Sequence, residues 1–321
     1  MPTTSDRGLF VWHELNTTDT TGADAFYSRL IGWKSKPWEP NPSYQVWTMG
    51  REGRAGLYQI HEIPNVLTPP PHWLNYIGTP DVDATVRQAV ELGGKVVTPA
   101  ADVPRVGRMA VLQDPQGAMF AVSARIERAR WKEPQIGDFS WHELLTSNYQ
   151  TAFDFYSKLF GWEKMLAMEL GPQGIYQIFG TGGHQLGGMF TPAPGAMPPG
   201  GPQWLPYIFV RDARKTAEVT KGLGALIAHE PTEVPGGDMV FTGVDRQGAM
   251  FAAHSKKREA PAPASTKRAK ATKIATKVTN TTKGTKNTKK KLKGAKKAAP
   301  KKAAPKKAAP KKAARKPSRR R

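Results

Sequence analysis

Two copies of the tripeptide Trp-His-Glu, Trp12 to Glu14 and Trp141 to Glu143, are the part of this 321-residue sequence best suited to chemistry. Side chains alternate between the faces of a β-strand, so the indole and carboxylate of each copy should share one face and the imidazole should take the other. An indole beside a carboxylate can recognise a cationic ligand by charge and cation–π contact. The alternative is a carboxylate that only hydrogen-bonds to a neighbouring strand or loop.

His13 and His142 are the obvious candidates for metal binding. Strand alternation places them on the face opposite the carboxylates, and we expect each to be a structural residue packed against the helix that follows; a one-residue change of register would reverse this. The absence of cysteine excludes thiol nucleophiles, disulfides and Cys-ligated zinc. We find no Gly-x-Ser-x-Gly motif and no other constellation for nucleophilic catalysis.

The two tripeptides belong to a long internal repeat. Residues 8–33 align without gaps on residues 137–162, with fourteen of 26 positions identical. Further along, DPQGAMFA at 114–121 matches DRQGAMFA at 245–252, where the spacing has grown by two residues. We place the two extra residues in a Pro- and Gly-rich loop at 192–202, because insertions cost little there.

Each repeat is predicted to contain a strand, a helix and three strands, and this order occurs twice within the repeat. In the first copy a strand precedes a helix whose apolar face is formed by Ala23, Phe26, Tyr27 and Leu30, with Asp19 or Thr20 as its N-cap. Short helices and mostly antiparallel strands indicate an α+β fold rather than a doubly wound sheet. We therefore predict domain 1 over 8–124, a linker over 125–136, domain 2 over 137–255 and a tail over 256–321.

This doubled order, the motif AxxFYxxLxGW in each copy and the DPxG-type turn before the last strand resemble the vicinal oxygen chelate superfamily. Its members are the glyoxalase, bleomycin-resistance and extradiol-dioxygenase proteins. The resemblance covers about 245 residues of the chain. It implies two tandem glyoxalase-like domains, each folding two βαβββ modules into a cup of curved sheet that holds a metal or a ligand.

Enzymes of this superfamily bind a divalent metal through residues of the first and last strands of a module. Carried over to this sequence, the ligand positions fall on Trp12, Trp141, Leu74, Leu205, Ala121 and Ala252. None of these side chains is a ligand for Mg²⁺, Fe²⁺ or Zn²⁺. We therefore expect the usual metal site to be missing from both copies and predict no cofactor; a divalent metal would enter only through atypical ligands.

Tyr76 and Tyr207 follow the two substituting leucines by two residues, so the resemblance places both phenols on the cup face. A phenol there can orient a ligand or act as an acid, and the alternative is an aromatic core residue. The expected ligand is a small aromatic or cationic molecule. The candidate cup residues are Trp12, Glu14, Tyr76, Trp141, Glu143 and Tyr207.

The net charge of +22 is the sum of two opposite parts. Residues 256–321 carry 27 of the 48 Lys and Arg and a single acid, Glu259, which leaves 21 basic and 25 acidic residues before them. This tail has no aromatic residue, and near its end proline recurs every five residues. Such a composition cannot bury a core, so we predict a disordered tail.

The tail resembles those of linker histones. Without aromatic rings it cannot stack on bases, so we expect sequence-independent binding to nucleic acid phosphates, with DNA and RNA equally compatible. A tail that only aids solubility is the alternative. The predicted contacts are Lys296, Lys297, Lys301, Lys302, Lys306, Lys307, Lys311, Lys312, Arg319, Arg320 and Arg321.

Two functions fit these observations. The first is a glyoxalase- or bleomycin-resistance-like binding protein without the metal, tethered to DNA or another polyanion by the tail. The second is a metal-dependent lyase or dioxygenase with atypical ligands. We find no signal-peptide pattern and no apolar run of eighteen residues, so we expect a soluble cytoplasmic protein associated with nucleoid or chromatin, and no membrane partner. The repeat suggests a monomer with an internal pseudo-dimer, or a homodimer.

Overall fold

The structure is a computed structural model of the chain, and it describes residues 6–60, 69–127, 130–171, 174–198 and 200–257. The predicted tail contacts lie outside these residues. Domain 1 contains β1 (Phe10–Thr17), α1 (Thr20–Ile31), β2 (Lys34–Trp38), β3 (Asn41–Met49), β4 (Glu52–Gln59), β5 (His72–Gly78), α2 (Val82–Glu91), β6 (Lys95–Val103), β7 (Gly107–Gln113) and β8 (Met119–Arg125). Domain 2 contains β9 (Phe139–Leu145), α3 (Tyr149–Phe160), β10 (Glu163–Glu169), β11 (Ile175–Thr181), β12 (His184–Phe190), β13 (Gln203–Phe209), α4 (Ala213–Gly222), β14 (Leu226–Glu233), β15 (Met239–Val244) and β16 (Met250–Ser255).

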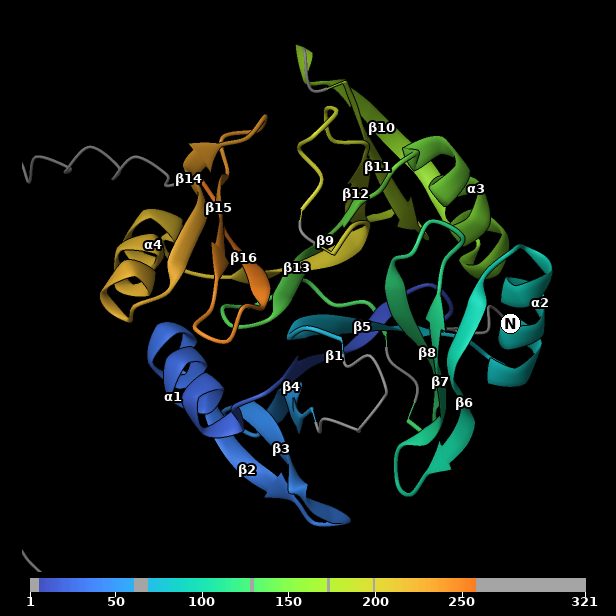
Figure 1. Ribbon diagram of the computed structural model, residues 1–321, viewed down its shortest axis with the longest axis horizontal. Helices are drawn as coiled ribbons and strands as arrows, with labels where there is room; N and C mark the ends of the chain where they lie inside the picture. The colour runs from blue at the N-terminus through green and yellow to red at the C-terminus, as the bar shows by residue number, and fades with distance from the viewer. Residues whose placement is uncertain (1–5, 61–68, 128–129, 172–173, 199, 258–321) are drawn as a thin grey trace, which may run out of the picture. The chain divides into compact units, whose positions relative to one another are not determined.

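Each domain forms one eight-stranded sheet, and the predicted α+β fold with two tandem domains is confirmed (Figure 1). In domain 1 the strand order is β2-β3-β4-β1-β5-β8-β7-β6, and domain 2 repeats it as β10-β11-β12-β9-β13-β16-β15-β14. The first strands of the two modules, β1 and β5, pair antiparallel at the centre of the sheet. Residues of these two strands therefore lie side by side at the bottom of the cup.

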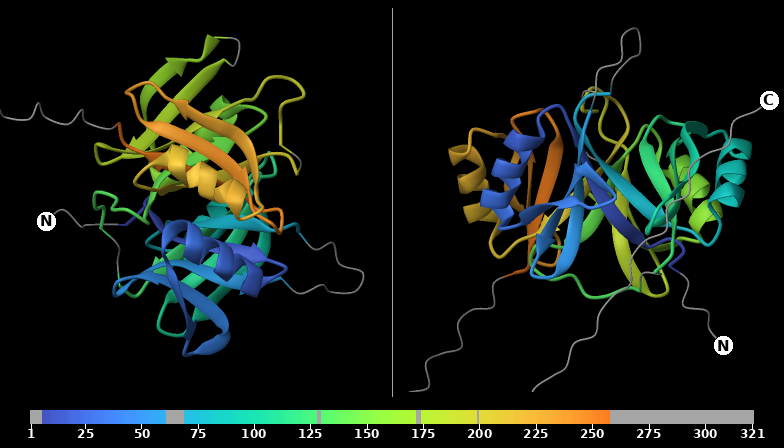
Figure 2. Two further views of the ribbon diagram at one scale, coloured as in Figure 1. Left: turned by 90° about the vertical axis from the view of Figure 1, so that its left-hand side faces the viewer. Right: turned by 90° about the horizontal axis from the view of Figure 1, so that it is seen from below.

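The helices join the two domains. Figure 1 and Figure 2 show them in two pairs, α1 beside α4 and α2 beside α3, with the strands between the pairs. Each of the two large buried clusters contains residues from both domains. Phe120 of β8, for example, packs against Phe155 and Tyr156 of α3, and Phe251 of β16 packs against Phe26 and Tyr27 of α1. The hydrophobic core is therefore shared between the domains.

The motifs common to both repeats carry hydrogen bonds across this interface. Tyr27 donates its hydroxyl to Asp245 Oδ2 at 3.1 Å, and Tyr156 donates to Asp114 Oδ2 at 3.0 Å. The tryptophan that ends each helix motif also crosses, since Trp33 Nε1 donates to the carbonyl of Gly137 at 3.0 Å. The motif spacing that the two repeats share thus positions side chains that contact the other repeat.

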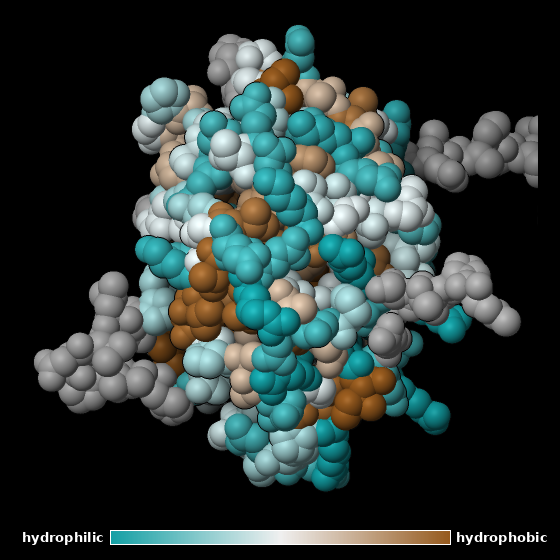
Figure 3. Space-filling model, turned by 90° about the vertical axis from the view of Figure 1, so that its right-hand side faces the viewer, coloured by the Kyte–Doolittle hydropathy of each residue, from teal (hydrophilic) through white to brown (hydrophobic). Residues whose placement is uncertain are grey.

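The outer face over α2 and α3 is mainly polar, and its apolar side chains occur in small separate patches (Figure 3). This agrees with helices that turn their apolar sides inward to the shared core. Among the described residues, none of the helices combines the length and the apolar character that a membrane span requires.

Candidate cup site

A glutamate, two tyrosines and a tryptophan form a hydrogen-bonded cluster in the cup of each domain. In domain 2, Trp141 Nε1 donates to the hydroxyl of Tyr176 at 2.8 Å, and this hydroxyl donates to Glu143 Oε2 at 3.0 Å. Tyr207 also hydrogen-bonds to Glu143. We call each of these groups a carboxyl–phenol cluster.

Domain 1 repeats the arrangement with its own residues. Trp12 Nε1 donates to the hydroxyl of Tyr44 at 3.1 Å, and Tyr44 donates to Glu14 Oε2 at 2.8 Å. Tyr76 is the second phenol on the carboxyl. The structure thus brings together all six sequence-predicted cup residues, three in each domain, and adds one tyrosine to each group.

The strand order explains how the clusters form. In domain 1, β1 supplies the indole and the carboxylate, and the pairing of Trp12 with Tyr76 brings in the phenol from β5. The other phenol comes from β3, which is separated from β1 by β4. The ring of Tyr44 passes directly over Gly56 of β4, where any Cβ would overlap it. Gly188 allows the same passage in domain 2, so glycine is required at both positions.

Sequence reasoning missed Tyr44 and Tyr176 because the repeat was aligned with the wrong offset in this region. Glu14 pairs with Gly56 and Glu143 pairs with Gly188, so these two glycines occupy equivalent positions. The offset between the repeats is therefore 132 residues at β4 and β12. The net gain of residues therefore lies before β11, and placing it in the loop at 192–202 was wrong. The available signal was the Tyr-Gln pair that both copies carry in the second strand after the first helix of each repeat, at Tyr44 in β3 and at Tyr176 in β11.

Burial controls the protonation of the two carboxyls. It raises the pKa of Glu143 to about 7, although hydrogen bonds from Tyr176 and Tyr207 act in the opposite direction. Burial also raises the pKa of Glu14. The phenols of both clusters have pKa values far above the usual range, first because they are buried and then because a carboxylate lies beside them. The phenols therefore remain protonated donors at neutral pH.

Replacing Glu143 with glutamine is expected to remove a pH-dependent loss of stability. The carboxyl ionises near pH 4.5 in the unfolded chain and near pH 7 in the folded one, so the wild type loses stability as pH rises through this window. The shift corresponds to about 3 kcal/mol. Urea unfolding at pH 5 and pH 8 gives the free energy of unfolding at each pH. Relative to the wild type, the free energy of unfolding of Glu143→Gln should be higher at pH 8 than at pH 5 by an amount of this order. The control Glu218→Gln, on the exposed side of α4, should show the same pH dependence as the wild type. Parallel pH profiles for Glu143→Gln and the wild type would contradict the assignment.

His13 and His142 lie on the opposite side of their strands from the carboxylates, as strand alternation predicts, but their partner is not the first helix. Their Nε2 atoms are 2.7 Å apart across the domain interface. His13 stacks on Phe139 and His142 on Phe10, each ring coming from the other domain. His142 Nδ1 donates to the carbonyl of Leu186, so its Nε2 accepts the proton of His13 Nε2.

Both imidazoles are neutral. Burial lowers the pKa of His142 to about 3 and lowers that of His13 well below its usual range, with the neighbouring His142 adding to the effect. The pair is thus a buried, uncharged hydrogen bond between the domains.

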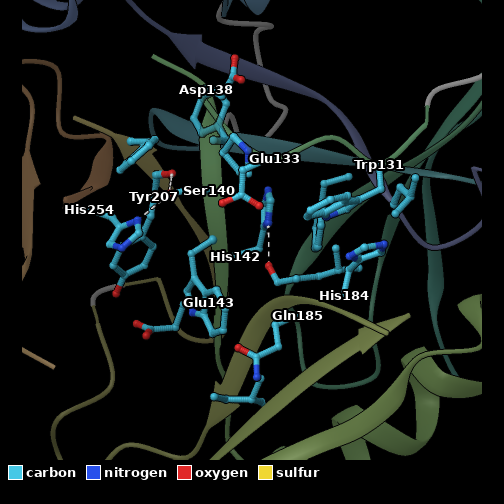
Figure 4. A pocket seen from close by; sticks show the side chains of 18 of the residues that line it. Trp131, Glu133, Asp138, Ser140, His142, Glu143, His184, Gln185, Tyr207 and His254 are labelled. Atoms are coloured by element: carbon cyan, nitrogen blue, oxygen red, sulfur yellow. Dashed lines mark hydrogen bonds between the residues drawn. The ribbon is translucent and has the colours of Figure 1, made fainter. Parts of the chain in front are cut away.

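A cavity of about 1650 Å³ reaches the carboxyl–phenol cluster of domain 2. Trp131 of the linker and His184 form part of its wall and stack on each other, with ring centroids 3.7 Å apart. Figure 4 shows these two rings on one side of the cavity, Glu143 on the other, and His142 and Gln185 between them.

Comparison with known proteins agrees with this geometry. A glyoxalase-like domain model matches residues 12–123, and the model of the Glyoxalase/Bleomycin resistance protein/Dioxygenase superfamily matches residues 138–252. The glyoxylase-named protein CFP32 of Mycobacterium tuberculosis is 31% identical over 261 residues, which cover 78% of this chain and 97% of that protein. The chain belongs to the glyoxalase/bleomycin-resistance/dioxygenase superfamily.

Three further proteins share less sequence identity with this chain. The anthracycline biosynthesis protein DnrV of Streptomyces peucetius is 27% identical over 274 residues, covering 80% of this chain and 96% of DnrV. The Mn(II)-bound glyoxalase of Novosphingobium aromaticivorans shares the fold with a TM-score of 0.55 at 15% identity, over 78% of this chain and 83% of that one. The 2,2',3-trihydroxybiphenyl 1,2-dioxygenase of Sphingomonas wittichii has a TM-score of 0.56 at 12% identity, with coverages of 78% and 90%.

The positions onto which the resemblance carries the superfamily's metal ligands lie together in this structure. In domain 1, Trp12 pairs with Tyr76, and Tyr76 pairs with Ala121 of β8, while Leu74 lies opposite Glu14. Glu14 is the one carboxylate in this group, and phenols and an indole surround it. Within the described ranges, no three His, Cys, Asp or Glu side chains gather as a metal-binding group. These residues do not fit a divalent metal, which prefers several carboxylate or imidazole ligands.

Proposed function

We propose that this protein is a small-molecule binding member of the superfamily that holds its ligand without the usual metal. The observation that carries the proposal is the duplicated carboxyl–phenol cluster in place of a set of metal ligands. Trp, Leu and Ala occupy the ligand positions in both domains, so the chemistry left in each cup is that of a glutamate, two phenols and an indole.

The direction of the hydrogen bonds defines what such a cup can bind. The indole of Trp141 donates to Tyr176, and both phenols donate to Glu143, so the donors of the cluster are already used within it. A carboxylate has about four lone-pair sites and two of these are occupied. The cluster therefore offers acceptors, and it suits a ligand that brings an N–H or O–H donor.

A cationic aromatic molecule meets these conditions best. Its positive charge compensates the half-buried carboxylate of Glu143, whose ionisation is otherwise opposed by desolvation. Its ring can pack on the aromatic and apolar walls of the cup. Because the cation must meet an ionised Glu143, affinity should rise with pH through the pKa of about 7.

The test of metal independence uses protein freed of nucleic acid and dialysed against EDTA. We expect 9-aminoacridine, a planar cation, to bind this protein as tightly as before dialysis, with fluorescence as the readout. Elemental analysis before dialysis should show only traces of Fe, Mn, Ni and Zn, and this content should not change in His13→Ala or His142→Ala. Stoichiometric metal, or binding that is lost with EDTA, would overturn the proposal.

Stoichiometric metal in the purified protein would favour the second candidate function, a metal-dependent lyase or dioxygenase with atypical ligands. The fold shared with a Mn(II)-bound glyoxalase and with dioxygenases supports this candidate. The donor set in the cups argues against it.

The proposal includes a tether. The basic tail at 256–321, with 27 Lys and Arg, would hold the binding domains on DNA or another polyanion through phosphate contacts. The charge and composition of the tail support this part of the proposal. Ligand binding by the two domains does not depend on it.

A further inference from the structure

In the part of the chain that the structure describes, the linker lines the cup of domain 2 and does not line the cluster of domain 1. The large cavity is lined by Trp141, Glu143, Tyr176 and Tyr207, which is the whole cluster of domain 2, whereas domain 1 contributes only Trp12 from its cluster. Linker residues 130–134 form one wall of this cavity.

The linker brings a planar surface into the cavity. Trp131 is 38% exposed, and its ring lies almost parallel to that of His184, with an angle of 8° between the planes. An indole held flat against another ring and left partly open to solvent keeps apolar area that a planar ligand can cover. This stack is an anchor for an aromatic ring.

The charges near the linker are largely paired with one another. Lys132 Nζ lies 3.0 Å from Glu52, and Lys256 Nζ lies 2.9 Å from Glu133. In the part of the chain that the structure describes, Glu143 has hydrogen bonds from phenols and no ion pair. Two further carboxylates of the cavity, Asp138 and Asp238, lie beside Arg54 and His254. Glu127 is exposed to solvent, so Glu143 is the carboxylate of the cavity that combines partial burial with the lack of an ion pair, and a cation that enters can pair with it.

We propose that the cup of domain 2 and the linker together form one binding site for an aromatic amine, with its ring on Trp131 and its amino group at Glu143. This inference rests on the proposed function and adds to it the stoichiometry, the second anchor and the chemical class of the ligand. The two anchors lie on opposite sides of the cavity, so a ligand of fused rings that carries an amino group is the matching shape (Figure 4).

The experiment titrates 9-aminoacridine into the full-length chain, freed of nucleic acid, at pH 8. We expect one bound molecule per chain. Glu143→Gln should weaken binding at least tenfold, while Glu218→Gln, on the exposed side of α4, should leave it unchanged. Glu14→Gln is titrated beside them to detect a second molecule bound in the cup of domain 1. Trp131→Ala should weaken binding about tenfold, and Trp131→Phe should restore most of the affinity, because a phenyl ring preserves the stacking surface. Thermal unfolding of each variant checks that it is folded.

The possible failures are distinguishable. Two molecules bound per chain, with Glu14→Gln and Glu143→Gln each removing one and Trp131→Ala having no effect, would overturn the single site and leave the proposed function standing. Unchanged binding in both glutamine variants, or no binding at all, would contradict the proposed function as well. Loss in Glu143→Gln with no effect of Trp131→Ala would remove the linker from the site.

Discussion

Truncation of the chain after Lys257 is expected to abolish binding to duplex DNA at moderate salt. The cut removes 25 of the 48 Lys and Arg and leaves domains with a small excess of acidic residues. Lys256 and Lys257 are kept because they contact Glu133 and Asp238 of the folded part. Domains of this charge have no electrostatic attraction for phosphates, so the affinity should reside in the tail.

The salt dependence of the full-length chain tests the mechanism. If about ten phosphates are neutralised together, log K should fall against log salt with a slope of roughly −9. Gel-shift titrations at several salt concentrations measure the slope. The matched control keeps the length of the tail and replaces its Lys and Arg with glutamine, and it should bind as poorly as the truncated chain. Retained affinity in the truncated chain would move the nucleic acid site onto the domains.

The residues at the bottom of the cup show how far the sequence could lead. Strand alternation and a repeat of high identity were enough to place Trp12 and Glu14 on one face and His13 on the other, because both rules act within a single strand. The start of the first helix could be predicted to within one residue from the candidate caps Asp19 and Thr20, and in the structure the carboxylate of Asp19 accepts a hydrogen bond from the amide of Gly22. Such features depend on near neighbours in the chain.

The features that could not be predicted depend on contacts between distant segments. Tyr44 reaches Glu14 across an intervening strand, and its counterpart Tyr176 was hidden by a change of offset before β11. The pairing of His13 with His142 requires the two domains to face each other, which no local pattern encodes. The stack of Trp131 on His184 has no second copy in the described residues, so the repeat gave no hint of it.

The shared core leads to the other large expected effect: neither domain should fold alone. Both large clusters draw residues from both domains, so separation would expose one side of each cluster to water. Burying a phenylalanine side chain stabilises the folded state by about 1.5–3 kcal/mol. A few such side chains therefore contribute as much as the whole free energy of unfolding of a typical domain, about 5–15 kcal/mol. Separately produced fragments 1–130 and 131–257 should each lack a cooperative unfolding transition and show poorly dispersed amide NMR signals.

Mixing the two fragments should restore both properties, because the contacts between the domains are noncovalent. Tyr27→Phe and Tyr156→Phe provide a matched pair within the intact chain. Each removes a cross-domain hydrogen bond and leaves a buried carboxylate oxygen and a buried indole N–H without the hydroxyl they share. Each should therefore cost about 1–3 kcal/mol in urea unfolding. A cooperative transition in either isolated fragment would show that the core of one domain suffices, and the pseudo-dimer would then be a docking of two finished domains rather than a condition for folding.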